Sequence, residues 1–351
     1  MPELRNRINK DELKRLLAKE KIERVTLSFY RYVKIENPKE LRDTLFIEWT
    51  ELNCFGRIYI AHEGINAQMS IPKSSWDEFV KQLYIHEYFT NVPFKLAVDD
   101  DGKSFYKLII KVKDKIVADG IDDPNFDASD TGTYLNAEGF NKAIEDPNTI
   151  VVDMRNHYES EVGRFEKAFC PDADTFREEL PLVVEHLKGQ EGKKVVMYCT
   201  GGIRCEKASA YLKHKGFKDV NHLHGGIIQY AQEVKQQGLE SKFKGINFVF
   251  DERIGERITD DVLSKCHQCG EPCDTHVNCK NDDCHLLFIQ CANCAEKLKG
   301  CCTLSCVDIA ALPIEEQRVL RKGRIKKGEE SLSVYKSRLR PNLADIIKAQ
   351  K

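Results

Sequence analysis

The stretch VVMYCTGGIRCEKASA, residues 195–210, has the pattern of a buried strand, a glycine-rich loop and a helix. An apolar run ends just before Cys199, two glycines follow, and a helical pattern begins after them. In open α/β sheets, ligands bind where strands end and helices begin. We therefore expect Cys199 to lie at the carboxyl edge of a parallel sheet, open to a bound ligand.

The residues around Cys199 favour a reactive thiolate. Gly201 and Gly202 allow a tight turn whose N–H groups face the sulfur. The positive end of the following helix, together with Arg204 and Lys207, lowers the pKa of a thiol at this place. We predict that Cys199 and Arg204 are catalytic, and that Gly201, Gly202 and Lys207 bind substrate. The alternative is a buried packing cysteine, since free cysteines are among the most buried residues.

The whole chain divides into five regions. With 351 residues it is long enough for two or three domains. A β-α-β-α-β pattern in 1–120 predicts a ferredoxin-like α/β sandwich, and the acidic, turn-rich run 121–130 predicts a linker. Alternating strands and helices in 131–240 predict a parallel α/β sheet covered on both faces, with Pro181 interrupting one helix. A cysteine-rich region (241–310) and a basic tail (311–351) complete this α/β multidomain chain.

Charge and hydropathy exclude some classes of protein. The chain has 54 Lys and Arg against 56 Asp and Glu, so its net charge does not indicate a nucleic-acid-binding protein. The tail, residues 311–351, has eleven basic and five acidic residues, an excess of six positive charges. The charged N-terminus lacks the apolar core of a secretion signal, and no apolar run is long enough to span a bilayer. We therefore expect a cytoplasmic protein without a membrane partner.

Ten of the fourteen cysteines lie in residues 266–306. In a reducing compartment this crowding points to bound metal rather than to disulfides. Structural zinc takes four tetrahedral ligands, and a pair of closely spaced cysteines supplies half of such a set. We predict two structural zinc ions, and the eight candidate ligands form four pairs along the chain: Cys266 and Cys269, Cys279 and Cys284, Cys291 and Cys294, and Cys302 and Cys306.

The pairing of these cysteines stays open at this point. If the pairs interleave, the first and third hold one zinc and the second and fourth hold the other. An iron–sulfur cluster is the alternative metal group. Five further residues remain as substitute ligands: Cys273, Cys301, His267, His276 and His285.

Three motifs resemble a rhodanese domain. Cys199, four residues and Arg204 are similar to the rhodanese active-site loop, which is one residue shorter than the Cys-x5-Arg loop of cysteine phosphatases. The shorter loop fits the outer sulfur of a persulfide or a similarly small group. VVDMRNHYESEVGRFEKA resembles the rhodanese strand and turn that here carry Asp153 and Arg155, which we expect to form a structural pair. NHLHGGI resembles the terminal strand and turn. For Cys205, a packing role and a role as resolving thiol remain open.

The whole chain resembles the oxygen-dependent tRNA uridine(34) hydroxylase family. AHEGINA, residues 61–67, is similar to its N-terminal signature, and CDTHVNC with CHLLFIQC to its C-terminal one. This resemblance implies an oxidoreductase that converts the wobble uridine in the anticodon stem-loop of tRNA to 5-hydroxyuridine, with molecular oxygen as co-substrate and Cys199 as the essential thiol. It also implies that His62, Glu63 and Asn66 line the nucleotide pocket and that the basic tail contacts phosphate. The electron donor and the oligomeric state are not implied.

Several chemical and functional alternatives remain open. Cys199 could add to C6 of uracil, or it could react as an oxidised or persulfide sulfur. No dinucleotide-binding fingerprint and no clear 2-His-1-carboxylate set supports flavin or non-haem iron. The alternative enzyme is a rhodanese-type sulfurtransferase that handles persulfide sulfur. A non-catalytic RNA-binding scaffold is the third class.

Overall fold

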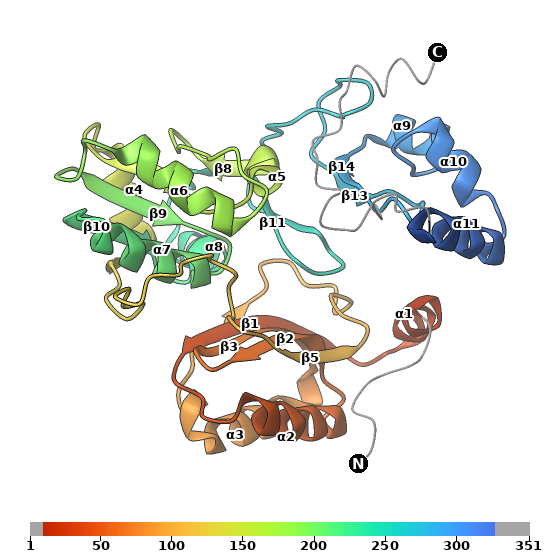
Figure 1. Cartoon of the computed structure of the whole chain (residues 1–351), viewed down its shortest axis with the longest axis horizontal. Coiled ribbons are helices and arrows are strands. Elements are labelled where there is room, and N and C mark those ends of the chain that lie inside the picture. The colour runs from red at the N-terminus through yellow and green to blue at the C-terminus, as the bar shows by residue number, and fades with distance from the viewer. Residues whose placement is uncertain (1–9, 327–351) are drawn as a thin grey trace. The chain divides into compact units, whose positions relative to one another are not determined.

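The computed structural model describes residues 10–326, whose elements are labelled in Figure 1. Contacts between Cα atoms divide the chain into two compact units. The first contains the residues up to Asn156, Lys167–Lys242 and Val249–Glu256. The second contains His157–Glu166, Phe243–Phe248 and the residues from Arg257.

The N-terminal part of the first unit is a five-stranded sheet in the order β4-β1-β3-β2-β5. All neighbouring strands are antiparallel except β2 and β5, which are parallel. Figure 1 shows α2 and α3 together on one side of this sheet, where the rings of Trp49 and Phe79 lie 5.7 Å apart in the core. This is the expected ferredoxin-like sandwich. Its elements are α1 (Lys10–Lys19), β1 (Arg24–Tyr32), α2 (Pro38–Glu51), β2 (Phe55–Ala61), β3 (Gly64–Pro72), α3 (Trp76–Ile85), β4 (Lys95–Leu96) and β5 (Leu108–Val112), with short 3-10 turns at Lys73–Ser75 and Glu87–Phe89.

The second part of the first unit is a parallel sheet in the order β6-β10-β9-β7. Side chains alternate along β9, so Val195 and Met197 pack against α6 and α7, whereas the Tyr198 ring contacts Phe140 of α4 on the other face. Helix α8 packs with α4. The sheet is therefore covered on both faces, as predicted. Its elements are β6 (Thr133–Leu135), α4 (Ala137–Glu145), β7 (Ile150–Asp153), α6 (Phe176–Leu187), β9 (Lys194–Tyr198), α7 (Ile203–His214), β10 (Asp219–Leu223) and α8 (Gly226–Gln237).

One helix differs from the sequence prediction. Pro181 does not interrupt α6, which continues through it to Leu187. The Thr175 side chain caps the first turn by accepting a hydrogen bond from the Glu178 N–H. Phe176, Leu180 and Val183 bury one face of the helix against the sheet. This burial outweighs the hydrogen bond that proline cannot donate, because most helix stability in proteins comes from packing an apolar face.

The second unit has short elements, and its core combines buried phenylalanines such as Phe165, Phe243 and Phe288 with cysteines. Strand β8 pairs antiparallel with β11, and β13 with β14. Buried cysteines take the place of much of its core, and all fourteen cysteines of the chain are free of disulfides. Its elements are α5 (His157–Val162), β8 (Gly163–Phe165), β11 (Phe243–Phe248), β13 (His276–Asn278), β14 (Leu287–Ile289), α9 (Ala292–Lys297), α10 (Leu304–Ala310) and α11 (Ile314–Lys326), and β12 (Gly255–Arg257) lies where the chain leaves the first unit.

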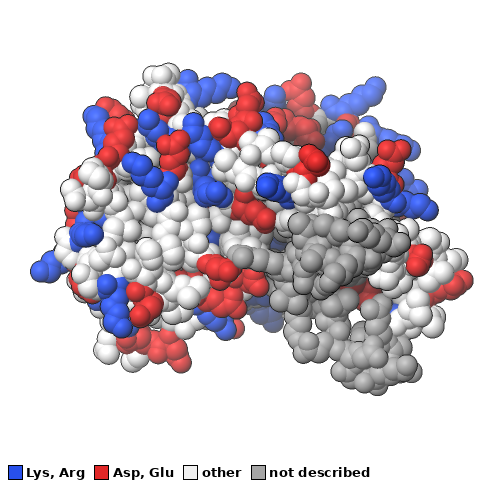
Figure 2. All heavy atoms as spheres, turned by 90° about the horizontal axis from the view of Figure 1, so that it is seen from above, with Lys and Arg blue, Asp and Glu red and all other residues white. Residues whose placement is uncertain are grey.

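The basic tail is only partly described. Its first part forms α11, and the run YKSRLRP lies outside the described residues. On the face drawn in Figure 2, basic and acidic side chains are interspersed. Within residues 10–326, none of the helices is both long and apolar enough to cross a membrane.

Candidate active site

The Cys199 loop lies between β9 and α7, at the carboxyl edge of the parallel sheet. Gly202 is the residue before α7 and has a φ of 95°, a conformation that favours glycine. The Gly202 N–H points at the thiol and donates a hydrogen bond of 3.1 Å to Cys199 Sγ. The loop amide therefore faces the sulfur, as the glycine pair predicted.

The pKa of Cys199 is lowered from 9.0 to about 6. Burial acts to raise the pKa, but it is outweighed by a hydrogen bond from the Cys205 thiol, the charge of Arg204, and the N–H groups of Cys205 and Gly202. Burial and the neighbouring Cys199 raise the pKa of Cys205 well above its usual value, so Cys205 stays a protonated donor. At neutral pH, Cys199 is mainly a thiolate.

The expectation that Cys199 is open to a ligand is wrong for this structure. Its side chain is 0% exposed. Tyr30 of β1 covers the loop, and a Cβ atom on Gly202 would lie 2.9 Å from the Tyr30 hydroxyl oxygen. The sulfur therefore lies beneath the surface, and a substrate reaches it only when this cover moves.

Asp153 and Arg155 form a buried pair in the first unit. Arg155 Nε and Nη2 donate hydrogen bonds of 2.8 and 2.7 Å to the two carboxylate oxygens of Asp153. The Tyr198 hydroxyl, at the end of β9, donates to the same carboxylate at 2.7 Å. Both members of the pair are fully buried, and the pair fixes β7 against the strand that leads into the Cys199 loop.

Lys207 and Glu63 contact each other. Lys207 Nζ lies 2.7 Å from a Glu63 oxygen and also donates to Asp119, whose side chain is 1% exposed. Burial acts to raise the pKa of Asp119, but hydrogen bonds from Lys115 and Lys207 hold that pKa below its usual value. These contacts join α7, the turn after β2 and the segment just before the predicted linker. They support a structural role for Lys207 and Glu63 rather than the predicted binding of substrate.

His62 and Asn66 also have partners within the protein. His62 Nδ1 lies 2.9 Å from the carbonyl oxygen of Ile35, and Asn66 Nδ2 donates to the carbonyl of Ile116 at 3.4 Å. Neither residue lines the cavity described next. Their role in binding a nucleotide stays a prediction without support from these contacts.

A cavity of about 450 Å³ adjoins the Cys199 loop. We call it the Tyr30 cavity. Its lining joins β1 and β4 to the edge of the parallel sheet, and the lining residues are Tyr30, Arg31, Tyr32, Pro93, Lys95, Tyr134, Glu206, His224 and Gly225.

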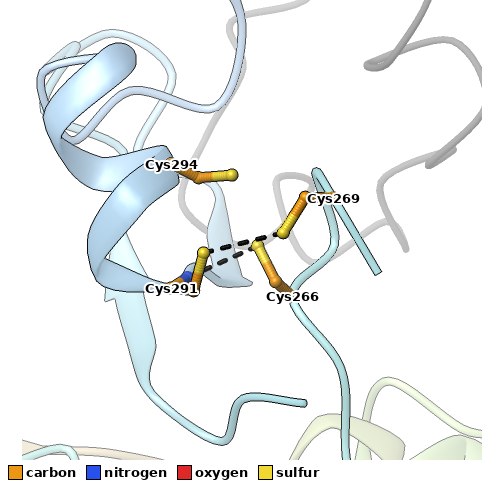
Figure 3. Close-up of side chains that lie close together, drawn as sticks. All are labelled: Cys266, Cys269, Cys291 and Cys294. Atoms are coloured by element: carbon orange, nitrogen blue, oxygen red, sulfur yellow. Dashed lines mark hydrogen bonds between the residues drawn. The ribbon is translucent and has the colours of Figure 1, made fainter. Parts of the chain in front are cut away.

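The cysteines of the second unit form two groups of four. The Sγ atoms of Cys266, Cys269, Cys291 and Cys294 lie within 4.8 Å of one another. Figure 3 shows the first two on a loop and the others at the start of α9, with all four sulfurs directed at a common centre. Cys279, Cys284, Cys302 and Cys306 form the second group. The pairs therefore interleave along the chain.

The sulfur spacing fits a tetrahedral ion. Contacts in the two groups are 3.6 Å between Cys269 and Cys291 and 3.7 Å between Cys284 and Cys302. Four thiolates at about 2.3 Å from zinc lie roughly 3.8 Å apart. Each group could therefore hold one metal ion, and zinc is compatible. Of the substitute ligands, His267 pairs with Glu161 at 2.8 Å and His285 lies 3.5 Å from Asp282.

Comparisons with known proteins agree with this architecture. Residues 24–116 match the UPF0176 acylphosphatase-like domain, 136–233 the rhodanese-like domain and 244–307 the rhodanese C-terminal family. The chain is 57% identical over 343 residues to the tRNA uridine(34) hydroxylase of Leptospira interrogans, covering 98% of this chain and 93% of that protein. It is 56% identical to the protein of the same name from Escherichia fergusonii, covering 97% of each chain. The chain belongs to the tRNA uridine(34) hydroxylase family.

For this member of the tRNA uridine(34) hydroxylase family, the sequence indicated the position of the Cys199 loop but not the Tyr30 cavity beside it. Tyr30 and Lys95 come from the N-terminal sheet, whereas Tyr134 and Glu206 come from the rhodanese-like domain. None of them belongs to a recognisable motif. The available signal was weak: two tyrosines alternate in the strand VTLSFYRYV, and Glu206 follows directly after Cys205.

Proposed function

We propose that this chain hydroxylates the wobble uridine of tRNA to 5-hydroxyuridine and that Cys199 is the reactive thiol. The observation that carries the proposal is the lowered pKa of Cys199, about 6, in a Cys-x4-Arg loop. The chain that holds this loop is similar over nearly its whole length to proteins named for this activity. An ordinary packing cysteine would instead have its pKa raised by burial, as Cys54 does.

Cys199 acts by adding to C6 of the uracil. The sulfur forms a bond to C6, and the electrons of the C5–C6 double bond move toward C5 and O4. The loop N–H of Gly202 and the charge of Arg204 stabilise the negative charge that develops on the base. C5 then reacts with molecular oxygen. One oxygen atom stays on C5, and the other becomes water with two electrons and two protons from a reductant. C5 then loses its own proton, the C5–C6 double bond forms again, and the bond from C6 to sulfur breaks. This step releases 5-hydroxyuridine and returns Cys199 as the thiolate.

A 5-fluorouridine at position 34 tests this addition. Fluorine cannot leave C5 as a proton does, so the wild-type protein should form a covalent complex with the RNA. Cys199→Ser should form none. Intact hydroxylation by Cys199→Ser, with no adduct in the wild type, would overturn the proposed role of the thiol.

A rhodanese-type sulfurtransferase is the second candidate function. The Cys-x4-Arg loop and the adjacent Cys205 thiol favour it, because a persulfide on Cys199 would sit in the same ring of donors. The two functions give different products. A sulfurtransferase makes thiocyanate from thiosulfate and cyanide, whereas the hydroxylase adds one oxygen atom to uridine in air.

We further propose that the two cysteine groups hold structural zinc. Four protein thiolates fill the tetrahedral shell of a zinc ion, so no coordination position is left for a substrate. A single ion also accounts for the sulfur spacing better than an iron–sulfur cluster does, because the several metals of a cluster hold the thiolates farther apart. Bound zinc would fix α9 and α10 in a unit that has a small apolar core.

The partner that this function requires is the anticodon stem-loop of tRNA, and we place the enzyme in the cytoplasm. Unpaired loop bases can be splayed out and held in a pocket, whereas bases inside a helix cannot. We assign phosphate contacts of this kind to the described basic residues of α11, Arg318, Arg321 and Lys322. Arg318 and Arg321 would exchange their ion pairs with Glu315 and Asp283 for the phosphates.

A further inference from the structure

The Tyr30 cavity has the size and lining of a site for one flat ring. Its volume of about 450 Å³ falls in the range of about 300–1,000 Å³ that is typical of small-molecule sites. Tyr30, Tyr32, Tyr134 and His224 contribute aromatic rings to its wall. Proteins that read unpaired RNA bases commonly stack them on such rings. The cavity therefore suits a nucleobase.

Glu206 supplies an acceptor to this cavity. The hydroxyls of Tyr30 and Tyr134 donate to the same carboxylate oxygen, Oε1, at 2.9 and 3.0 Å. Burial and Glu206 raise the pKa of Tyr30 well above its usual value, so its hydroxyl remains a donor. Among the contacts of the described residues, Oε2 receives no such bond, and a carboxylate can accept several. The second oxygen can therefore accept from a ligand.

Lys95 supplies a cation. Its side chain is buried at 7% exposure, and its Nζ lies 4.1 Å from the centre of the Tyr30 ring. No carboxylate of the described residues forms an ion pair with it. Burial lowers its pKa to about 8, partly offset by the charges of Glu206 and Cys199, so the amine is mainly protonated at neutral pH. The face of an aromatic ring compensates only part of the cost of burying an ammonium, so a ligand that provides an acceptor would stabilise Lys95 further.

The cavity adjoins the reactive loop. A Cβ atom on Gly202 would lie 3.6 Å from Gly225, which lines the cavity, and one on Gly225 would lie 3.6 Å from Lys95 Cε. A base held there is next to the residues that surround Cys199.

We propose that the Tyr30 cavity binds the uracil base and distinguishes it from cytosine, with Glu206 accepting from N3–H and Lys95 donating to O4. This inference rests on the proposed function, which makes a tRNA uridine the substrate. Cytosine has an acceptor at N3 and an amino group at position 4. It would place a lone pair against the Glu206 carboxylate and a donor against the Lys95 ammonium, and such mismatches strongly reject the wrong ligand.

Binding of two RNA hairpins tests the proposal. The hairpins carry the anticodon stem-loop sequence and differ only in having U or C at position 34, and fluorescence anisotropy gives the affinity for each. The wild type should bind the U34 hairpin roughly tenfold or more tightly, as the loss of a hydrogen bond to a charged group implies. Glu206→Gln and Lys95→Met should each bring this ratio close to one. Glu138→Gln, an exposed glutamate paired with Lys142, is the matched control and should keep the wild-type ratio.

Each outcome decides the question. Equal binding of both hairpins by the wild type overturns the proposal, and so does an equal loss of affinity for both in the two variants, which indicates a structural role. Circular dichroism verifies folding, and Lys95→Met serves if Glu206→Gln fails to fold. Binding needs no turnover, so the two proposals can fail separately. If the protein binds U34 more tightly than C34 but makes no 5-hydroxyuridine, only the proposed function is refuted. If it makes 5-hydroxyuridine but binds both hairpins equally, only this inference is refuted.

Discussion

The Tyr30 hydroxyl on β1 donates a hydrogen bond of 2.9 Å to the Glu206 carboxylate on α7. A second bond, from the Tyr32 hydroxyl to the carbonyl of Ile203, joins the same strand to the first turn of that helix. Both bonds lie directly beside the Cys199 loop. Strand β1 of the acylphosphatase-like domain therefore packs against the first turns of α7, the helix that follows the Cys199 loop.

Activity should follow the ionisation of Cys199. The thiolate is the reacting form, so kcat/KM for hydroxylation should rise with pH through about 6. Cys205→Ala removes the thiol that donates a hydrogen bond to Cys199. The loss of this bond should raise the Cys199 pKa and move the rise of kcat/KM to higher pH. Cys205→Ser keeps a donor and should remain near the wild-type midpoint. The pH profile of kcat/KM for the three proteins measures this, and a midpoint unchanged by Cys205→Ala would show that the Cys205 thiol does not cause the low pKa.

Gly202→Ala should destabilise the protein. Gly202 has a φ of 95°, and a Cβ atom there would meet the Tyr30 hydroxyl at 2.9 Å. A non-glycine residue in this conformation costs roughly 1–2 kcal/mol. The matched control is Gly201→Ala, where an added Cβ meets no atom within 4 Å. Urea unfolding compares the two variants, and a similar free energy of unfolding for both would show that the loop relaxes freely.

Lys207→Met should be strongly destabilising if Lys207 is structural. The substitution removes the partner of Glu63 and one of the two lysine partners of the buried Asp119. Breaking a buried pair in this way costs about 3 kcal/mol. Lys142→Met breaks the exposed pair with Glu138 and should leave the free energy of unfolding nearly unchanged. Equal stability of both variants, with RNA binding lost only in Lys207→Met, would instead support the substrate-binding role.

Metal content should follow the two groups of cysteines. Mass spectrometry of the purified protein for metals should find about two zinc ions per chain. Cys291→Ser and Cys302→Ser should each lose one, because they belong to different groups. Cys273→Ser, which lies between the first two pairs but in neither group, should keep both ions. Loss of both ions in every variant, or iron in place of zinc, would contradict two independent zinc sites.

The parts of the molecule that local sequence dictates could be predicted. The strand and helix order specified both sheets, because apolar periodicity reports which face of each element is buried. The spacing of the cysteine pairs likewise allowed the interleaved arrangement, although their metal ligation stays a prediction. The loop amide at Gly202 followed from a glycine at a strand-to-helix turn.

Contacts between distant segments could not be predicted in the same way. The sequence of the Cys199 loop carries no information on what packs over it, so the burial of the sulfur under Tyr30 was missed. Lys207 and Glu63 were predicted to bind substrate because each lies in a motif associated with a site, and only the fold shows that they pair with one another. Local patterns predict the elements, whereas side-chain partners 144 residues apart depend on how those elements pack.

The most direct measurement of the central claim is mass spectrometry of the nucleosides from unmodified tRNA after incubation in air with the purified protein and a reductant. Wild-type protein should add one oxygen atom to the wobble uridine, and Cys199→Ser, folded and with unchanged metal content, should add none. Formation of 5-hydroxyuridine by Cys199→Ser at the wild-type rate would contradict the account.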